Sequence, residues 1–279
     1  MFGLQAGLRL LKPSPQGLRA TNMQIDDRHF ELCLAQDRAD LHAAQRLRYD
    51  VFVAELGADG PMVDHDARRE IDRFDAHVDH LLLRDTRRPA DDQVVGVYRL
   101  LTEQGAVAAG QFYSEDEYEL SALKRSGRRL LELGRSCLHR DYRGGTAMMH
   151  LWAGLAGYIA AREVEVLFGV ASFHGCDPAP LAGPLSLLHH RHLAPPDLRP
   201  VARASGYQRM DLIAEADLDR PAAIRAVPAL IKAYLRLGGV VGQGAYLDHA
   251  FNCLDVCLVM DVARIPETSR AIYQRGALA

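Results

Sequence analysis

The chain has 279 residues, of which 48% are hydrophobic and 25% charged, and its formal net charge is −3. This ordinary globular composition excludes a largely disordered chain, and the slight negative charge argues against a nucleic-acid partner. The five cysteines are irregularly spaced without a CxxC pair, so we expect reduced thiols in a cytoplasmic protein and no metal site. No apolar run approaches the ~20 residues that span a membrane.

Hydrophobic periodicity predicts alternating strands and helices in the first half of the chain. In chain order we expect a strand over 29–35, a helix over 39–56 ended by Gly57, an acidic loop over 58–75, two antiparallel strands over 77–85 and 92–101, and a loop with a short helix over 112–127.

A strand–helix–strand unit follows and forms the centre of the predicted fold. LLELGRSCLH reads as a strand, an amphipathic helix begins near Gly145, and VEVLFGVASF is a short apolar strand buried on both faces. Later in the chain, Pro228 opens a helix that runs through Leu237, and LDVCLVMDV is a last buried strand.

These elements predict a single α/β domain over residues 1–279. Residues 1–25 are expected to be a flexible leader or a short surface helix. Residues 174–279 are expected to form a C-terminal elaboration of the domain. No internal repeat and no linker argues for a second domain.

Six charged residues, three of each sign, lie in or beside apolar segments. An unpaired charge in a core is very costly, so the equal numbers predict one compensated network. This network either consists of structural ion pairs alone or lines a cleft in which a carboxyl pKa is tuned for chemistry. The residues are Arg48, Asp72, Asp75, Arg99, Glu132 and Arg135.

Glu132 and Arg135 lie three residues apart in one predicted strand, where regular alternation would point them to opposite faces. Gly134 is a natural place for a bulge that turns both towards one cleft and frees backbone N–H groups to polarise a carbonyl. We expect Glu132 to act as a general base, since burial raises a carboxyl pKa. The alternative is that Glu132 only anchors Arg135 or Arg48.

The segment LHRDYRGGTAMMHLW connects the central strand to the following helix. Its glycines permit a tight turn, and the exposed N–H groups of a helix start form a ready site for an anion. We expect contacts with the donor from Arg140, Arg143, Gly144, Gly145 and Thr146.

This turn resembles the pyrophosphate-binding turn of the GNAT acyltransferase superfamily, whose pattern is R/Q-x-x-G-x-G/A. Counted from Arg143, the two small residues of the pattern are replaced by Thr146 and Met148. This departure favours an acyl carrier protein as donor, because that protein presents phosphopantetheine without the nucleotide of coenzyme A. No separate cofactor is then expected.

The motifs RYDVF, DRFD, GVYRLL and ELGR are similar to the signature of acyl-homoserine-lactone synthases, which are GNAT-like. The tryptophan that follows LG in those synthases is absent, since Ala58 follows here, and this chain is longer. A closer similarity, over nearly the whole chain, is to the ornithine N-alpha-acyltransferases. It rests on RYDVFVAELG, FDAHVDHLLLRD, VVGVYRLL, FYSEDEYEL, LELGRSCLHRDYRGG and VLFGVASFHGCDP.

The resemblance implies a GNAT-like, mostly antiparallel central sheet flanked by helices. It also implies transfer of a 3-hydroxyacyl chain from acyl carrier protein to the α-amine of ornithine, giving lyso-ornithine lipid for ornithine lipid biosynthesis. Arginines would bind the ornithine carboxylate and aspartates an ammonium group. The expected substrate-contacting residues are Arg48, Phe52, Asp72, Asp75, Arg99 and His174, and the expected catalytic residues are Glu132 and Arg135.

Two surface segments suggest partners. The basic cluster Lys124, Arg125, Arg128 and Arg129 is either a solvated face or a dock for an acidic carrier protein. The run HHRH over 189–192 is either a solvated basic surface or, with the leucines of 181–188, a segment that covers the acyl channel or contacts anionic lipid at the inner face of the membrane. Two functional alternatives remain: an acyl-homoserine-lactone synthase, and a non-catalytic module that binds acyl chains or carrier protein.

Overall fold

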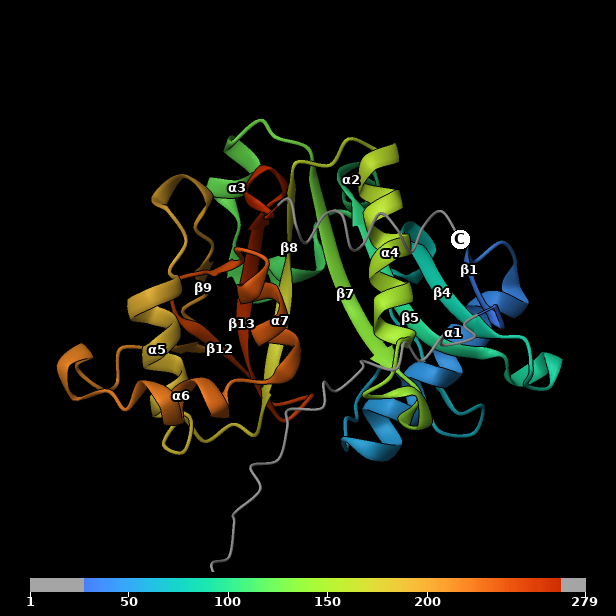
Figure 1. Ribbon diagram of the computed structural model, residues 1–279, viewed down its shortest axis with the longest axis horizontal. Helices are drawn as coiled ribbons and strands as arrows, with labels where there is room; N and C mark the ends of the chain where they lie inside the picture. Colours follow the sequence, from blue (N-terminus) through green and yellow to red (C-terminus); the bar gives the residue numbers. More distant parts are fainter. Residues whose placement is uncertain (1–27, 267–279) are drawn as a thin grey trace, which may run out of the picture.

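The computed structural model describes residues 28–266, which form one large mixed sheet with helices on both faces (Figure 1). The leader predicted for residues 1–25 lies outside the described residues. The strands of the sheet are, in spatial order, β1 (Phe30–Leu34), β4 (Asp79–Asp85), β5 (Val94–Thr102), β7 (Leu130–Leu138), β8 (Val166–His174), β13 (Cys253–Asp261), β12 (Ala245–Asp248) and β10 (Tyr207–Gln208), and β11 (Val240–Val241) also pairs with β13.

Neighbouring strands in this sheet are antiparallel, except β7 and β8, which are parallel. This arrangement confirms the predicted α/β class with a mostly antiparallel central sheet. Two small two-stranded sheets accompany it: β2 (Val63–Asp64) with β3 (Arg69–Glu70), and β6 (Tyr118–Glu119) with β9 (Val201–Ala202).

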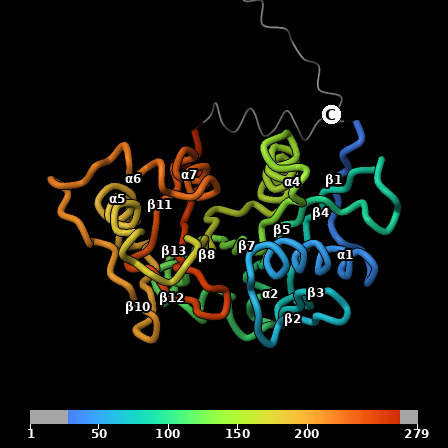
Figure 2. The backbone as a smooth tube through the Cα atoms, turned by 90° about the horizontal axis from the view of Figure 1, so that it is seen from below, coloured from blue at the N-terminus to red at the C-terminus, as the bar shows by residue number. Residues whose placement is uncertain are grey.

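Helices cover both faces of the large sheet (Figure 2). Helix α4 packs on β1, β4 and β5, whereas α1 packs against β4, β5 and β7 from the other face. The helices are α1 (Arg38–Arg48), α2 (Glu103–Ala109), α3 (Ser121–Arg125), α4 (Ala147–Ala161), α5 (Ala182–His192), α6 (Arg220–Ala226) and α7 (Ala229–Arg236).

The strand and helix predictions for the central unit are confirmed with small shifts of their ends. The strong β-branched and leucine content of β5, β7 and β13 explains why these strands are buried almost throughout. A helix is present over the predicted residues 39–56, but its type changes along its length. Helix α1 ends at Arg48, and a π-helix continues over Tyr49–Glu55. Such π-helical turns occur often at functional sites.

The part of the chain after residue 174 extends the same sheet with strands β10 to β13 and adds helices α5 to α7. Helix α5 contradicts one expectation. Its leucines Leu185, Leu187 and Leu188 are buried in the main hydrophobic core, so they are not exposed to lipid. None of the helices within residues 28–266 combines the length and the apolar character needed to cross a membrane.

Strands β7 and β8 pair only at their beginnings, from Leu130 opposite Val166 to Glu132 opposite Phe168. Beyond this point they diverge. The pairing of β7 with β5 also shifts by one residue, because Val97 faces Cys137 while Arg99 faces Gly134. The predicted bulge is therefore present. It lies just beyond Gly134, where Arg135 has a positive φ of 48°.

Candidate active site

A cavity of about 340 Å³ lies where β7 and β8 diverge. Its walls come from β7, β8 and β13, from the π-helix and from α7. Leu167 faces Met260 across the β8–β13 pair, and His174 faces Cys253 at the other end of that pair. The lining therefore changes along the cavity. Its apolar end contains Leu167, Phe168, Leu230, Leu258 and Met260, and its polar end contains Ser172, His174, Asp248, Cys253 and Asp255.

Arg135 is the one arginine that lines this cavity within residues 28–266. Its Nε donates to Oε1 of Glu70 and its Nη2 to Oδ2 of Asp72, both at 3.0 Å. The guanidinium also lies over the rings of Tyr113 and Phe251, at 4.8 Å from each centroid. Two carboxylates and two aromatic rings thus hold its charged group in a fixed orientation at the cavity wall.

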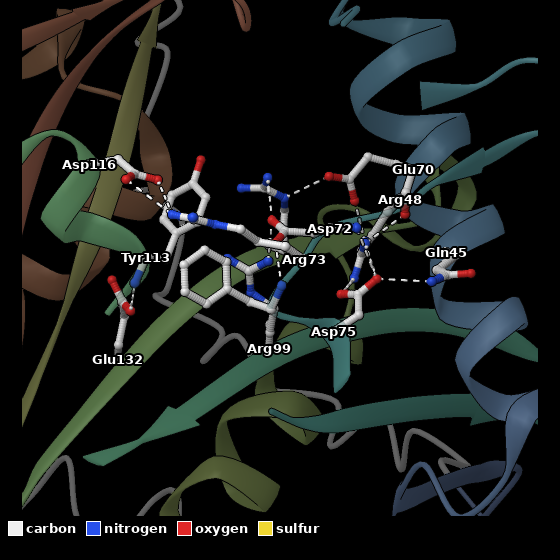
Figure 3. A network of polar contacts seen from close by, with 12 residues as sticks. Gln45, Arg48, Glu70, Asp72, Arg73, Asp75, Arg99, Tyr113, Asp116 and Glu132 are labelled. Carbon is white, nitrogen blue, oxygen red and sulfur yellow. Dashed lines mark hydrogen bonds and ion pairs between the residues drawn. The ribbon is translucent and has the colours of Figure 1, made fainter. Parts of the chain in front are cut away.

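Arg48 is fully buried, and Figure 3 shows its contacts with Glu70 and Asp75. Its guanidinium donates to both carboxylate oxygens of Asp75, at 2.7 and 2.9 Å, and to the side chain and backbone carbonyl of Glu70. Gln45 donates to Asp75 as well, at 2.9 Å. Burial alone would raise the pKa of Asp75, but the hydrogen bonds and charge of Arg48 outweigh it and lower this pKa to about 2.

Arg99 completes the network. Its Nη1 donates to Oδ2 of Asp72 at 2.6 Å, and Gly134 leaves room for its guanidinium, 3.4 Å from where a Cβ would stand. Three arginines and three carboxylates are therefore paired in one cluster, as predicted for a balanced network. The membership differs in one carboxylate, because Glu70 occupies the place expected for Glu132.

Glu132 is buried on β7 but does not line the cavity. Its carboxylate accepts hydrogen bonds from the backbone N–H of Tyr113 at 2.7 Å, and from the backbone N–H of Ser114 at 2.6 Å and its hydroxyl. Burial raises its pKa, although these hydrogen bonds oppose the shift. The bonds anchor the turn that carries Tyr113, whose ring lines the cavity.

The structure thus separates the predicted site residues into groups. Phe52, Arg135 and His174 line the cavity. Arg48, Asp72, Asp75 and Arg99 are nearly inaccessible and bind one another or Glu70. None of these four lines the cavity, so their contact with the acceptor stays a prediction.

The predicted donor residues lie together in the turn between β7 and α4. Arg143 donates to the carbonyl of Leu138 at 3.0 Å and pairs with Glu55 at 2.8 Å. Gly144 has a φ of 78°, a conformation that favours glycine, and Thr146 directly precedes α4. The turn follows the last residue of β7, Leu138, so it lies beyond the end of the strand that is nearer to Arg135.

The basic cluster predicted as a carrier dock lies at the other end of β7, roughly 25–30 Å away for a nine-residue strand. Three of its members are paired with acids: Lys124 with Glu115 at 2.8 Å, Arg128 with Asp261 at 2.7 Å and Arg129 with Glu163 at 2.9 Å. These pairings favour the alternative of a solvated face.

Sequence reasoning missed Glu70, Glu117, Asp248 and Asp255. Asp255 carries the same signal as Glu132, a charge inside an apolar strand, within the predicted strand LDVCLVMDV. Glu70 belongs to a segment that was expected to be an exposed loop and instead forms strand β3, where its side chain is buried.

A family model described as "Acetyltransferase (GNAT) domain" matches residues 47–153, which include the π-helix, β4, β5, β7 and the turn before α4. This match, together with the mostly antiparallel sheet, indicates a GNAT-like acyltransferase fold. Among solved structures, the acyl-homoserine-lactone synthase LasI is similar at 17% identity and a TM-score of 0.47, over 88% of this chain and 95% of that chain.

Sequence relatives give the narrower family. The chain is 56% identical over 248 residues to an L-ornithine N(alpha)-acyltransferase of Rhodobacter capsulatus, which covers 88% of this chain and 95% of the relative. It is 43% identical to an L-ornithine N(alpha)-acyltransferase of Brucella abortus, over 90% of each chain. The chain belongs to the L-ornithine N(alpha)-acyltransferase family.

Proposed function

We propose that this protein transfers a (3-hydroxy)acyl chain from acyl carrier protein to the α-amine of ornithine, giving lyso-ornithine lipid for ornithine lipid biosynthesis. The observation that carries the proposal is the 56% identity, over 88% of the chain, to a relative named for acylation of that amine. The cavity supports it, because its apolar end suits an acyl chain and its charged end suits an amino acid.

In the reaction, the neutral α-amine attacks the thioester carbonyl, so that a C–N bond forms and the C–S bond breaks. The thiol of phosphopantetheine leaves with a proton. The bulge of β7 at Arg135 removes backbone groups from the ladder with β5, and beyond Glu132 the other edge of β7 is not paired with β8. Backbone N–H groups there would polarise the thioester carbonyl.

Arg135 would bind the carboxylate of ornithine. Its position at the cavity wall and its two fixed carboxylate partners orient the guanidinium before the substrate arrives. A pre-oriented arginine loses little side-chain entropy when it binds a carboxylate.

The proton of the attacking ammonium group requires an acceptor. His174 is the one imidazole that lines the cavity within the described part of the chain, and imidazole is the commonest general base. Glu132, the base expected from the sequence, is separated from the cavity by the turn that it anchors. We therefore assign proton transfer to His174 and a positioning role to Glu132.

The stability and turnover of two variants separate these roles. His174→Gln should lower kcat by about 100-fold, the lower end of general-base contributions, and leave the melting temperature unchanged. Glu132→Gln should lower the melting temperature together with kcat. A Glu132→Gln enzyme with the stability of the wild type and a kcat lowered by about 100-fold would return the base role to Glu132.

The donor turn favours a carrier-linked thioester over coenzyme A. Met148 packs against the main core, and Thr146 stands at the helix start, so the turn lacks the two small residues that would let a pyrophosphate approach the backbone. Phosphopantetheine on a carrier protein has no nucleotide to place there.

The proposal is tested with purified protein, a 3-hydroxyacyl carrier protein and, in separate reactions, ornithine, lysine and S-adenosylmethionine, with products identified by mass spectrometry. We expect an acyl-ornithine and much less product with the other two acceptors. A parallel reaction with the same acyl chain on coenzyme A tests the donor. The proposed function would be contradicted if only S-adenosylmethionine gave a product, or if none of the three acceptors did.

A further inference from the structure

Three carboxyl groups gather at the polar end of the cavity, and we call Glu117, Asp248 and Asp255 the acidic cluster. Asp255 lies on β13 opposite Ser172 of β8, Asp248 ends β12, and Glu117 lies directly against Asp255. Asp248 and Asp255 line the cavity. The cluster is therefore built from separate parts of the chain and converges on the same space as Arg135.

The acidic cluster lacks the compensation found in the arginine network. Asp255 and Glu117 are only 3% and 4% exposed, yet Oδ1 of Asp255 and Oε2 of Glu117 have no hydrogen-bond partner. Among the ion pairs of residues 28–266, none includes a member of the cluster. Buried polar atoms without partners are rare, and Asp255, which lines the cavity, is placed to accept a hydrogen bond from a bound substrate.

The electrostatics of the cluster favour a bound positive charge. Burial, together with repulsion from Asp248, raises the pKa of both Glu117 and Asp255. Both carboxyl groups therefore hold a proton more tightly than ordinary carboxyl groups do. A bound positive charge would take over the role of that proton.

We propose that the acidic cluster binds the side-chain ammonium group of the acceptor and makes the enzyme specific for an amino acid with a second, charged amine. This inference rests on the proposed function, since it assigns the two charged ends of ornithine to Arg135 and to the cluster. An ammonium group offers three N–H donors, which match the carboxylate oxygens of the cluster.

The same assignment explains which amine reacts. Neighbouring carboxylates favour the charged form of an ammonium group, and a protonated amine is not a nucleophile. The amine held by the acidic cluster is thus protected, while the α-amine beside Arg135 and His174 remains free to lose its proton. The cluster would select both the acceptor and its reacting nitrogen.

A metal ion is the competing occupant, because ligand atoms of Asp248, Cys253 and Asp255 all lie within 4.8 Å of one another. Metal binding by cysteine requires the thiolate. Burial raises the pKa of the Cys253 thiol far above its ordinary value, and nearby Asp255 raises it further. Because this cysteine is not a thiolate, the singly charged ammonium group at the end of an apolar side chain fits the site better than a divalent metal ion does.

The test compares ornithine with norvaline (2-aminopentanoate), which lacks only the side-chain amine, in the wild type and in Asp255→Asn. We expect kcat/KM of the wild type to favour ornithine by roughly 30-fold or more, the scale of a buried charge pair, and the variant to lose most of this preference. Asp116→Asn is the matched control. It removes an exposed carboxylate next to Glu117 that pairs with Arg73, and it should keep the preference.

A thermal readout separates a ligand site from a structural role. Asp255→Asn should not lower the melting temperature of the ligand-free protein, because burial raises the pKa of Asp255 and an amide resembles the protonated carboxyl group in shape and charge. Ornithine should stabilise the wild type but not the variant. A lower melting temperature for Asp255→Asn would assign the carboxylate to folding instead.

The remaining outcomes distinguish this inference from the proposed function. If the wild type acylates ornithine and norvaline equally well, the inference fails and the proposed function stands. If the wild type acylates neither, the proposed function itself fails. If activity requires a divalent ion whose binding is lost in Asp255→Asn, the cluster is a metal site and the ammonium assignment is wrong.

Discussion

Removal of the Arg48 side chain tests the buried network most sharply. Arg48→Met keeps a side chain of similar length and leaves the carboxylates of Glu70 and Asp75 without their main cationic partner. Both are nearly inaccessible, and Arg48 donates three hydrogen bonds to these carboxylates and a fourth to the backbone carbonyl of Glu70. Breaking a buried pair by removing one partner costs about 3–5 kcal/mol, so we expect a loss of this size in the free energy of unfolding.

Urea denaturation followed by far-ultraviolet circular dichroism measures this loss. Arg68→Met is the matched control, since Arg68 pairs with Asp50 on the surface, where the side chains are 62% and 43% exposed. That substitution should cost about 1 kcal/mol or less. Adding Asp75→Asn to Arg48→Met should recover part of the lost stability, because it removes one stranded charge. A loss below about 1 kcal/mol for Arg48→Met would refute the network as a stabilising element.

Three further predictions concern acid stability, the strand gap and the donor turn. The folded pKa of Asp75 is about 2 against an ordinary 3.8. Its ionisation therefore adds about 2 kcal/mol above pH 4, which is lost as the pH falls from about 4 to 2, and an acid titration of Asp75→Asn should lack this part. In Gly169→Ala, the new Cβ would lie 2.1 Å from a backbone carbonyl of β7, so urea titration should show a loss of about 1–3 kcal/mol in the free energy of unfolding. Gly157→Ala is the control, since its Cβ would have no neighbour within 4 Å, and it should not lose stability. The double variant Thr146→Gly, Met148→Ala should raise the rate with acyl-coenzyme A, relative to the carrier-linked donor, by about tenfold. This factor corresponds to one hydrogen bond from the backbone of the turn to the charged pyrophosphate, which contributes about 1.5 kcal/mol.

The sequence predicted the strands and the bulge because both follow from local patterns. Alternation placed β4, β5 and β7, and the three-residue spacing of Glu132 and Arg135 around Gly134 required an irregular strand. The bulge then followed from the geometry of a pleated strand alone.

Partner choice within the site could not be predicted in this way. Whether Arg135 pairs with Glu132 or with Glu70 depends on how the segment before Asp72 folds against α1, and no local pattern in that polar segment reveals it. The acidic cluster was missed for a related reason. Its members come from β12, β13 and the turn after η4 (Tyr113–Asp116), so their convergence is set by sheet order and not by spacing along the chain.

The identity of the acylated nitrogen tests the central claim most directly. The purified protein is incubated with a 3-hydroxyacyl carrier protein and ornithine, and fragmentation of the product in the mass spectrometer locates the amide. The proposed roles of Arg135, His174 and the acidic cluster predict an amide on the α-nitrogen and a free side-chain amine. An amide on the side-chain nitrogen, or the absence of any acyl-ornithine, would contradict the account.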